Sequence, residues 1–410
     1  MMHQYFQDLV KGIEGTIGEG SAPPSARKLF ALEIGRLGAR LYSGVDRVAW
    51  CGVSAPFDLL NALGVTSCFV EFVGAMLAST GGIVSPLQEA ERAGFAADTC
   101  GYHRAVVGSA RQGLMPVPDF LIGTTCPCSG GLATIENLAR LFRRDLFVLQ
   151  VPQEDSLGSV RYLAGQMLDL VAFVSGHTGA PLDPERLRAA VECTNRARAL
   201  MLEAYGFARE VPSPVASRDL KNFGIVMALL LGTEASVQVA AAFRDEFRNR
   251  VAAGAAGVKG EQVRLMWIQN RIQFRHPLEE MLEREYRASI VVDELNEITW
   301  DPIDPGDPYP GMARRAISIP FNGSVGNRVR HLQQLARSYR IRGAINPCHW
   351  GCRQGTGARG LIEEGLKEVG VPVLNLEVDC VDTRNFSEGQ LRTRLEAFLE
   401  MITAGPSPWN

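Results

Sequence analysis

The sequence predicts an α/β protein with two parallel-sheet lobes and a helical segment between them. In the first and last thirds of the chain, short apolar runs alternate with helical patterns, as they do in the βαβ units that form parallel sheets. From about residue 159 to residue 256, by contrast, almost every stretch has helical periodicity. We therefore divide the 410 residues into an N-terminal helical segment (1–40), a first lobe (41–158), a helical segment (159–256) and a second lobe (257–410).

The first lobe is predicted from runs such as RVAWCGV, FLIGTT and LFVLQVP, whose apolar and β-branched residues are typical of buried strands. Helical patterns such as SGGLATIENLARLFRR lie between these runs. The elements expected here, in chain order, are strand 47–53, helix 55–64, strand 65–72, strand 120–125, helix 129–144 and strand 146–152.

The helical segment and the second lobe are predicted in the same way. Asp183 comes directly before a long helical pattern and is the expected N-cap of that helix. Ser387 and Gln390 have the spacing of a capping box at the start of the last helix. The elements expected in the second lobe are strand 263–269, helix 276–286, strand 288–295, helix 327–340, strand 343–347, helix 356–370, strand 371–379 and helix 387–402.

The composition limits the classes of protein that fit. Hydrophobic residues at 46% and charged residues at 21% are ordinary for a globular protein, and a net charge of -3 without a basic run gives no reason to expect a nucleic-acid partner. The longest apolar run, 223–232, is too short to span a bilayer, and the N-terminal run lacks the apolar core of a secretory signal. We expect a cytoplasmic protein that binds neither nucleic acid nor a membrane.

The nine cysteines are the strongest functional signal in the chain. Two close pairs follow predicted strands, and two single cysteines stand at the ends of elements. Ligands of open parallel sheets bind outside the carboxyl ends of the strands, so we expect the thiols of the two lobes to face one another across a cleft. The six cysteines placed in this way are Cys100, Cys126, Cys128, Cys348, Cys352 and Cys380.

Clustered thiols in a chain of this length favour soft-metal ligation over disulfides, which belong to small secreted domains without a sufficient core. Several thiolates at once favour an iron–sulfur cluster. A four-thiolate zinc site is the rival interpretation, but the two Cys-x2-Cys motifs typical of such sites are absent from the sequence.

Other residues have plainer interpretations. Cys51 follows a strand and stays an open candidate ligand, whereas Cys68 and Cys193 are predicted to be small core residues. His349, beside a paired cysteine, is the candidate catalytic residue or a hydrogen-bond donor to the cluster. The histidines predicted to be structural or exposed are His103, His177, His276 and His331.

A dense charged turn follows the last predicted strand. It contains Asp379, Asp382 and Arg384. We interpret this group either as an ion-paired loop or as a part of the functional site. Both arrangements perturb the pKa values of ionisable groups, so both interpretations stay open.

Four segments together resemble one family. They match in position and order the subunits of the 2-hydroxyacyl-CoA dehydratase and benzoyl-CoA reductase superfamily, from about Leu41 to Ile402. The resemblance is most specific in the tail and weakest in the helical middle. The segments are APFDLLNALG, TTCPCSGGLATIENLA, HWGCRQ and VPVLNLEVDCVDTRNFSEGQLRTRLEAFLEMI.

The resemblance implies flavodoxin-like (Rossmann-like) lobes, assembly with an identical or related subunit, and a [4Fe–4S] cluster. The cluster ligands that it implies are Cys100, one of the pair Cys126 and Cys128, and Cys352. It also implies a separate ATP-hydrolysing activator, carrying its own [4Fe–4S] cluster, that delivers low-potential electrons. The chain itself has no phosphate-binding loop of the form GxxxxGK[ST] after a strand, which agrees with a separate ATPase.

The sequence departs from the dehydratase pattern because it carries the second cysteine of each pair together with Cys380. Six thiolates are the number that two cubanes joined by a sulfide need, so the chain is similar to the double-cubane branch of the superfamily. We therefore expect an iron–sulfur reductase that acts on a small molecule. The alternatives are a single-cluster dehydratase or benzoyl-CoA reductase-type subunit acting on an acyl-CoA, and a non-catalytic electron-transfer protein.

Overall fold

The computed structural model describes residues 2–19 and 24–409 and contains two parallel sheets of four strands each. The first sheet has the strand order β2-β1-β3-β4 and the second has the order β6-β5-β7-β8. Six strands are buried at every position, as expected where helices cover both faces of a parallel sheet. The strands are β1 (Val48–Cys51), β2 (Thr66–Phe69), β3 (Phe120–Thr124), β4 (Leu146–Leu149), β5 (Val263–Trp267), β6 (Ala288–Asp293), β7 (Gly343–His349) and β8 (Val373–Val378).

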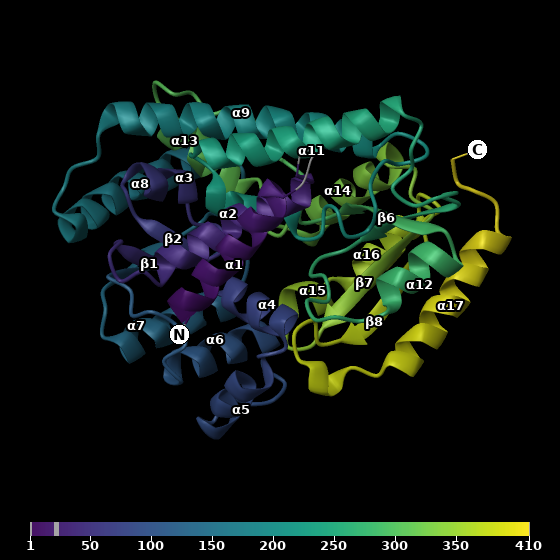
Figure 1. Cartoon of the computed structure of the whole chain (residues 1–410), viewed down its shortest axis with the longest axis horizontal. Coiled ribbons are helices and arrows are strands. Elements are labelled where there is room, and N and C mark those ends of the chain that lie inside the picture. Colours follow the sequence, from purple (N-terminus) through teal and green to yellow (C-terminus); the bar gives the residue numbers. More distant parts are fainter. Residues whose placement is uncertain (1, 20–23, 410) are drawn as a thin grey trace.

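Figure 1 shows the two sheets in separate lobes, with long helices running over both of them. Each strand order is that of a flavodoxin-like sheet, in which the order reverses between the first and the third strand. The predicted fold class is therefore confirmed, while the division of the chain into four parts with the stated boundaries stays a prediction.

Helices of the first lobe include three that the sequence did not predict. The segment between 71 and 119 forms α4, α5 and α6, so the predicted strand 65–72 ends earlier, at Phe69, and α6 begins directly after Cys100. Cys100 therefore precedes a helix instead of closing an element. The helices of this lobe are α3 (Phe57–Ala62), α4 (Glu71–Thr80), α5 (Val84–Arg92), α6 (Gly101–Arg111) and α7 (Ser129–Phe142).

The middle of the chain is helical, as predicted, and α9 and α11 pack side by side along the top of the molecule (Figure 1). Asp183 is the N-cap of α9, since its side chain accepts a hydrogen bond from the Glu185 backbone N–H at 2.9 Å. The elements are α8 (Leu157–Thr178), α9 (Pro184–Ala208), α10 (Phe223–Met227), the 3₁₀ helix η1 (Ala228–Leu230) and α11 (Glu234–Ala252).

In the described part of the chain, α8 is the one helix that is long and apolar enough to cross a membrane, by length and composition only. This helix packs against β4 and α13, and its buried residues Leu163, Met167 and Leu170 belong to the core of the first lobe. The helix therefore packs on the first lobe with one face, while only 28% of its most apolar stretch is buried.

The second lobe differs from the prediction at two points. Strand β7 continues two residues beyond Pro347 because β8 extends the ladder, pairing Cys348 with Glu377 and His349 with Val378. Ser387 is the N-cap of α17 but makes no capping hydrogen bond, so the predicted capping box does not form. The helices are α12 (Leu278–Glu285), α13 (Pro308–Ile317), α14 (Val325–Ser338), α15 (Arg353–Thr356), α16 (Arg359–Lys367), the 3₁₀ helix η2 (Thr383–Asn385) and α17 (Glu388–Ala404).

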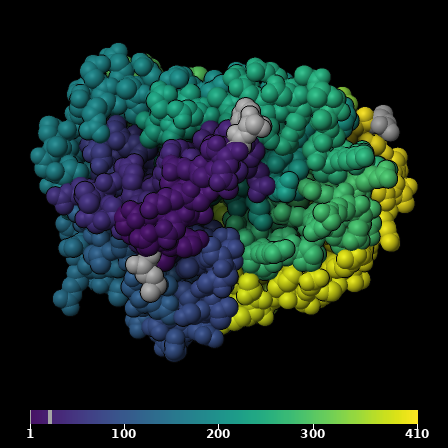
Figure 2. Space-filling model, viewed as in Figure 1, coloured from purple at the N-terminus to yellow at the C-terminus, as the bar shows by residue number. Residues whose placement is uncertain are grey.

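The N-terminal helices α1 (Met2–Gly18) and α2 (Ala26–Leu41) pack against each other. Phe6 is buried between them and stacks on Tyr42 with ring centroids 5.5 Å apart. Figure 2 shows these two helices lying across the middle of one face of the molecule, between the two lobes.

Candidate functional site

A cavity of about 970 Å³ lies between the lobes, outside the carboxyl ends of their strands. Its walls are the loops that follow β1, β3, β5, β6 and β7, and residues of α1 and α2 line another side. Beside these helices the surface is hollowed where atoms of the two lobes meet (Figure 2). Both sheets reverse their strand order here, which is where open parallel sheets bind ligands. The two sheet edges face one another, as the sequence predicted.

Three of the candidate cysteines line this cavity, and each is the N-cap of a helix. Cys100 caps α6, Cys128 caps α7 and Cys352 caps α15. The backbone N–H of Gly131 donates to the Cys128 sulfur at 3.3 Å, and that of Gly355 donates to the Cys352 sulfur at 3.4 Å. Backbone N–H groups at helix N-termini stabilise negative charge, so these positions suit thiolates.

A glycine brings the thiols of the two lobes together. Gly351 has a φ of +75°, in the left-handed region that favours glycine. A Cβ atom added at this position would also collide with the backbone nitrogen of Cys100. The turn that carries Cys352 therefore approaches the start of α6 as closely as it does only because residue 351 has no side chain.

The thiols that line the cavity, on Cys100, Cys128 and Cys352, are the kind of donor that an iron–sulfur cluster binds. Among residues 2–19 and 24–409, no three His, Cys, Asp or Glu side chains lie close enough together to hold a single metal ion. A cubane needs its thiolates farther apart, because each binds a different iron atom. Burial raises the pKa of the Cys100 and Cys352 thiols, so binding of the cluster would have to displace their protons.

His349 lies behind Cys100 and does not line the cavity. It is fully buried, and burial lowers its pKa to about 4, so the ring is neutral. The backbone N–H of Cys380 donates to its Nδ1 at 2.9 Å, which leaves the proton on Nε2, 3.3 Å from the Cys100 sulfur. His349 is thus placed to donate a hydrogen bond to the Cys100 sulfur once that thiol loses its proton, and its catalytic role stays a prediction.

A second histidine lies in the cavity wall. The Nε2 atom of His103 is 3.6 Å from a carboxylate oxygen of Glu71. Burial alone would lower the pKa of His103, but the Cys128 sulfur and Glu71 raise it to about 9. The other carboxylate oxygen of Glu71 is buried and has no hydrogen-bond partner. This pair is an acid–base couple beside a candidate ligand.

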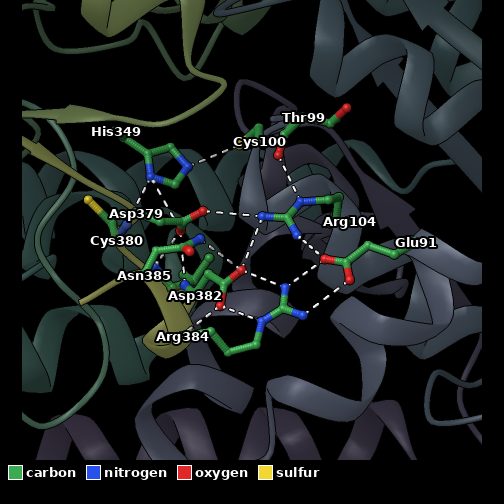
Figure 3. Close-up of polar contacts among 11 residues, drawn as sticks. Glu91, Thr99, Cys100, Arg104, His349, Asp379, Cys380, Asp382, Arg384 and Asn385 are labelled. Atoms are coloured by element: carbon green, nitrogen blue, oxygen red, sulfur yellow. Dashed lines mark hydrogen bonds and ion pairs between the residues drawn. The ribbon is translucent and has the colours of Figure 1, made fainter. Parts of the chain in front are cut away.

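The charged turn after β8 is an ion-paired loop that joins the two lobes. Arg104 of the first lobe is 1% exposed, and its guanidinium lies 3.4 Å from Asp379 and 3.3 Å from Asp382 of the second lobe (Figure 3). Arg384 bonds both to Asp382, at 2.7 Å, and to Glu91, at 2.6 Å. Figure 3 shows this network directly beside His349 and Cys100, so it supports the site from behind.

The other three candidate thiols do not line the cavity. Cys126 packs in the core of the first lobe. Cys348 is a strand residue, so its side chain points to the opposite face from His349, and its sulfur lies 3.7 Å from the Asn375 side chain. Cys380 is fully buried behind the wall, where burial, Asp379 and then the Cys352 and Cys100 thiols raise its pKa.

The remaining cysteines and histidines lie outside the cavity. Cys51 and Cys68 are buried in β1 and β2, and Cys193 is a half-buried residue of α9. Three of the four histidines predicted to be structural or exposed are also away from it, while His103 is the exception. Those three are His177, His276 and His331.

One glycine run has the spacing GxGxxG, from Gly355 to Gly360, yet its glycines do not serve a dinucleotide. In that motif the third glycine allows close packing of helix and strand. A Cβ atom at Gly360 would meet nothing within 4 Å, and one at Gly355 would collide with the side chain of Gln269. Gly355 instead makes room for Gln269, whose amide donates to the Cys352 sulfur at 3.4 Å.

Residues 53–402 match the family model described as 2-hydroxyglutaryl-CoA dehydratase, D-component. The chain belongs to this family. It is 24% identical over 373 residues to the (R)-phenyllactyl-CoA dehydratase alpha subunit of Clostridium sporogenes, covering 88% of this chain and 90% of that protein. Identity is also 24% to the alpha subunit of the lactoyl-CoA dehydratase of Anaerotignum propionicum (88% and 91% covered) and to a benzoyl-CoA reductase subunit of Thauera aromatica (84% and 85% covered). The chain is an enzyme of the dehydratase superfamily.

Four residues of the site gave no signal in the sequence. Glu71, His103, Arg104 and Gln269 belong to no motif and reach the cavity or its supporting wall only through the packing of the lobes. For Gln269, the one available clue was its place at the end of a predicted strand.

Proposed function

We propose that this chain is a 2-hydroxyacyl-CoA dehydratase-type subunit with one [4Fe–4S] cluster, held by Cys100, Cys128 and Cys352. The observation that carries the proposal is that these three thiols, contributed by both lobes, line one cavity, whereas Cys126 and Cys348 do not. When bound, such a cluster supplies low-potential one-electron chemistry.

The surrounding residues have separate tasks in this proposal. Dehydration of a 2-hydroxyacyl thioester removes the C2 hydroxyl group and a C3 proton, so the site needs a group that accepts and returns protons. The couple of His103 and Glu71 lines the cavity and meets this need. His349 orients the Cys100 thiolate through its Nε2–H, which makes it a positioning residue instead of one that touches the substrate.

A double-cubane reductase is the second candidate, and one observation favours it. Cys380 is close enough to Cys100 and Cys352 for their charges to influence one another, so a fourth thiolate is available behind the cavity wall. This candidate also requires Cys126 and Cys348 as ligands. Neither lines the cavity, although the Cys126 thiol is close enough to Cys128 for the charge of Cys128 to add to the effect of burial in raising its pKa. The single cluster needs only thiols that line the cavity.

The proposal includes partners. The sequence has no phosphate-binding loop, so the electrons come from a separate ATP-hydrolysing activator with its own [4Fe–4S] cluster. The chain works as a dimer with an identical or related subunit, in the cytoplasm, where its nine free thiols stay reduced.

Anaerobic purification followed by iron and sulfide analysis tests the cofactor. About four irons per chain support one cubane, and about eight support the double cubane. The purified enzyme is then incubated with 2-hydroxy-4-methylpentanoyl-CoA, ATP and a family activator, and formation of the 2-enoyl-CoA is followed by mass spectrometry. A colourless protein with stoichiometric zinc would end the proposal.

A further inference from the structure

The part of the cavity away from the cysteines is walled by apolar side chains of the first lobe. Phe57, Phe69 and Phe72 line it in a row, with ring centroids 6.3 Å apart for the first two and 5.9 Å for the last two. Met76, one turn further along α4, extends this wall. These rings come from α3, from the end of β2 and from α4, so three elements of the first lobe build one apolar surface.

Apolar side chains also line the facing walls, among polar ones such as Asn222 and Gln273. Ile225 of α10, Met312 of α13 and Trp300 line the cavity from the other side. Phe6 of α1 and Ile34 of α2 also line it. At about 970 Å³, the cavity is at the upper end of the volumes of ligand pockets, so it has room for an organic group beside a cofactor.

The cationic group within these apolar walls is already neutralised. Arg315 lines the cavity beside Trp300, but its guanidinium binds both carboxylate oxygens of the fully buried Asp58, at 2.7 and 2.8 Å. Of the cations that line the cavity within the described residues, Arg353 alone has no acidic partner, and it is exposed and next to Cys352. The apolar walls thus offer no free positive charge.

The acidic groups in the second-lobe wall are paired in the same way. Glu294 binds Arg328 at 2.6 Å. Glu297 lies 3.7 Å from Arg209 and also accepts a hydrogen bond from the Tyr339 hydroxyl at 2.5 Å. A further carboxylate beside the aromatic row of Phe57, Phe69 and Phe72 would meet apolar side chains, and the cation of these walls, Arg315, is already bound to Asp58. Burial of an unpaired carboxylate is strongly unfavourable.

We infer that the acyl group of the substrate carries a neutral, apolar side chain, aliphatic or aromatic, and not a second carboxylate. This inference rests on the proposed function, because it assumes a CoA thioester whose reacting carbons lie near the cysteines. The apolar walls then hold the side chain of the 2-hydroxy acid, and they select substrates by excluding charge.

Binding of saturated thioesters tests this inference without requiring turnover. Titration calorimetry on the anaerobic holoenzyme compares 4-methylpentanoyl-CoA with glutaryl-CoA, whose acyl groups are of similar size and end in an isopropyl group and in a carboxylate, respectively. We expect the apolar thioester to bind at least about tenfold more tightly. Equal or tighter binding of glutaryl-CoA would overturn the inference.

A pair of variants locates the selectivity in the apolar walls. Ala75 of α4 lines the cavity and is half-buried, so Ala75→Arg places a cation there. This variant should reduce the preference for the apolar thioester by at least about threefold. The same change at Ala93, an exposed residue outside the cavity, should leave the preference unaltered. An unaltered preference in Ala75→Arg would contradict the inferred location.

The outcome for the proposed function is read separately, from turnover of 2-hydroxy-4-methylpentanoyl-CoA by the same preparation with activator. Selective binding of the apolar thioester without dehydration supports the inference and counts against the proposed reaction. Failure of both thioesters to bind would overturn the inference together with the proposed function.

Discussion

Loss of Arg104, the buried arginine that joins the lobes, should destabilise the protein measurably. In Arg104→Met, Asp379 loses its one guanidinium partner and keeps the backbone N–H groups of Val381 and Asp382, both at 2.9 Å, while Asp382 still binds Arg384. Both carboxylates are fully buried. Removing one partner of such a group costs about 3–5 kcal/mol, because an uncompensated charge stays in the interior. Since Asp382 keeps a partner, we expect a loss at the lower end of this range, about 3 kcal/mol.

Urea unfolding of the apoprotein, followed by tryptophan fluorescence, measures this loss as a shift in the midpoint of the first transition. Arg284→Met is the control, because Arg284 pairs with Glu280 at the surface, with 79% and 61% of the two side chains exposed, and such pairs contribute below about 1 kcal/mol. The double variant Arg104→Met/Asp379→Asn should be less destabilised than Arg104→Met alone. If Arg104→Met cost no more than the control, the interpretation of this network as a buried bridge would be wrong.

Three further predictions test other parts of the structure. Gly351→Ala should destabilise the protein by more than about 2 kcal/mol and lower its iron content, because the residue has a positive φ and abuts Cys100. The control is Gly176→Ala, in open space on α8, which should be neutral or slightly stabilising in thermal unfolding. If the stability and the iron content of Gly351→Ala matched those of the unmodified protein, the turn could relax and the prediction would be wrong. Burial lowers the pKa of His276 to about 4, so the unfolded chain binds the proton first, and stability should fall as the pH drops from about 6.5 towards 4. His276→Gln should flatten this part of the stability curve in urea titrations, and an identical pH dependence would contradict it. Gln269→Ala removes a hydrogen-bond donor to the Cys352 sulfur, so the reduction potential of the cluster should become more negative at unchanged iron content. Redox titration followed by electron paramagnetic resonance measures this potential, and an unchanged value would argue against the contact.

The strands could be predicted from the sequence because their signals are local. Runs such as 120–125 and 263–269 are apolar over most of their length, and the structure has β3 and β5 there. The position of Cys128 and Cys352 at the cavity also followed from a general rule, since both come after a strand at the edge where parallel sheets bind ligands.

What could not be predicted depends on partners distant in the chain. The sequence suggests that β7 ends at Pro347, but pairing with β8 carries it on to His349, and this turns Cys348 into a strand residue. Likewise, the first lobe does not show by itself that Cys100 meets His349, or that Arg104 meets Asp379, because these contacts arise only when the lobes dock.

The iron content of two variants, two residues apart, tests the central claim most directly. Cys128 lines the cavity, whereas Cys126 packs in the core of the first lobe. With the fold of each variant checked by circular dichroism, anaerobically purified Cys126→Ser should keep about four irons per chain, and Cys128→Ser should lose most of them. Loss of iron from Cys126→Ser with full retention in Cys128→Ser, or equal loss from both, would contradict a single cluster held by Cys100, Cys128 and Cys352.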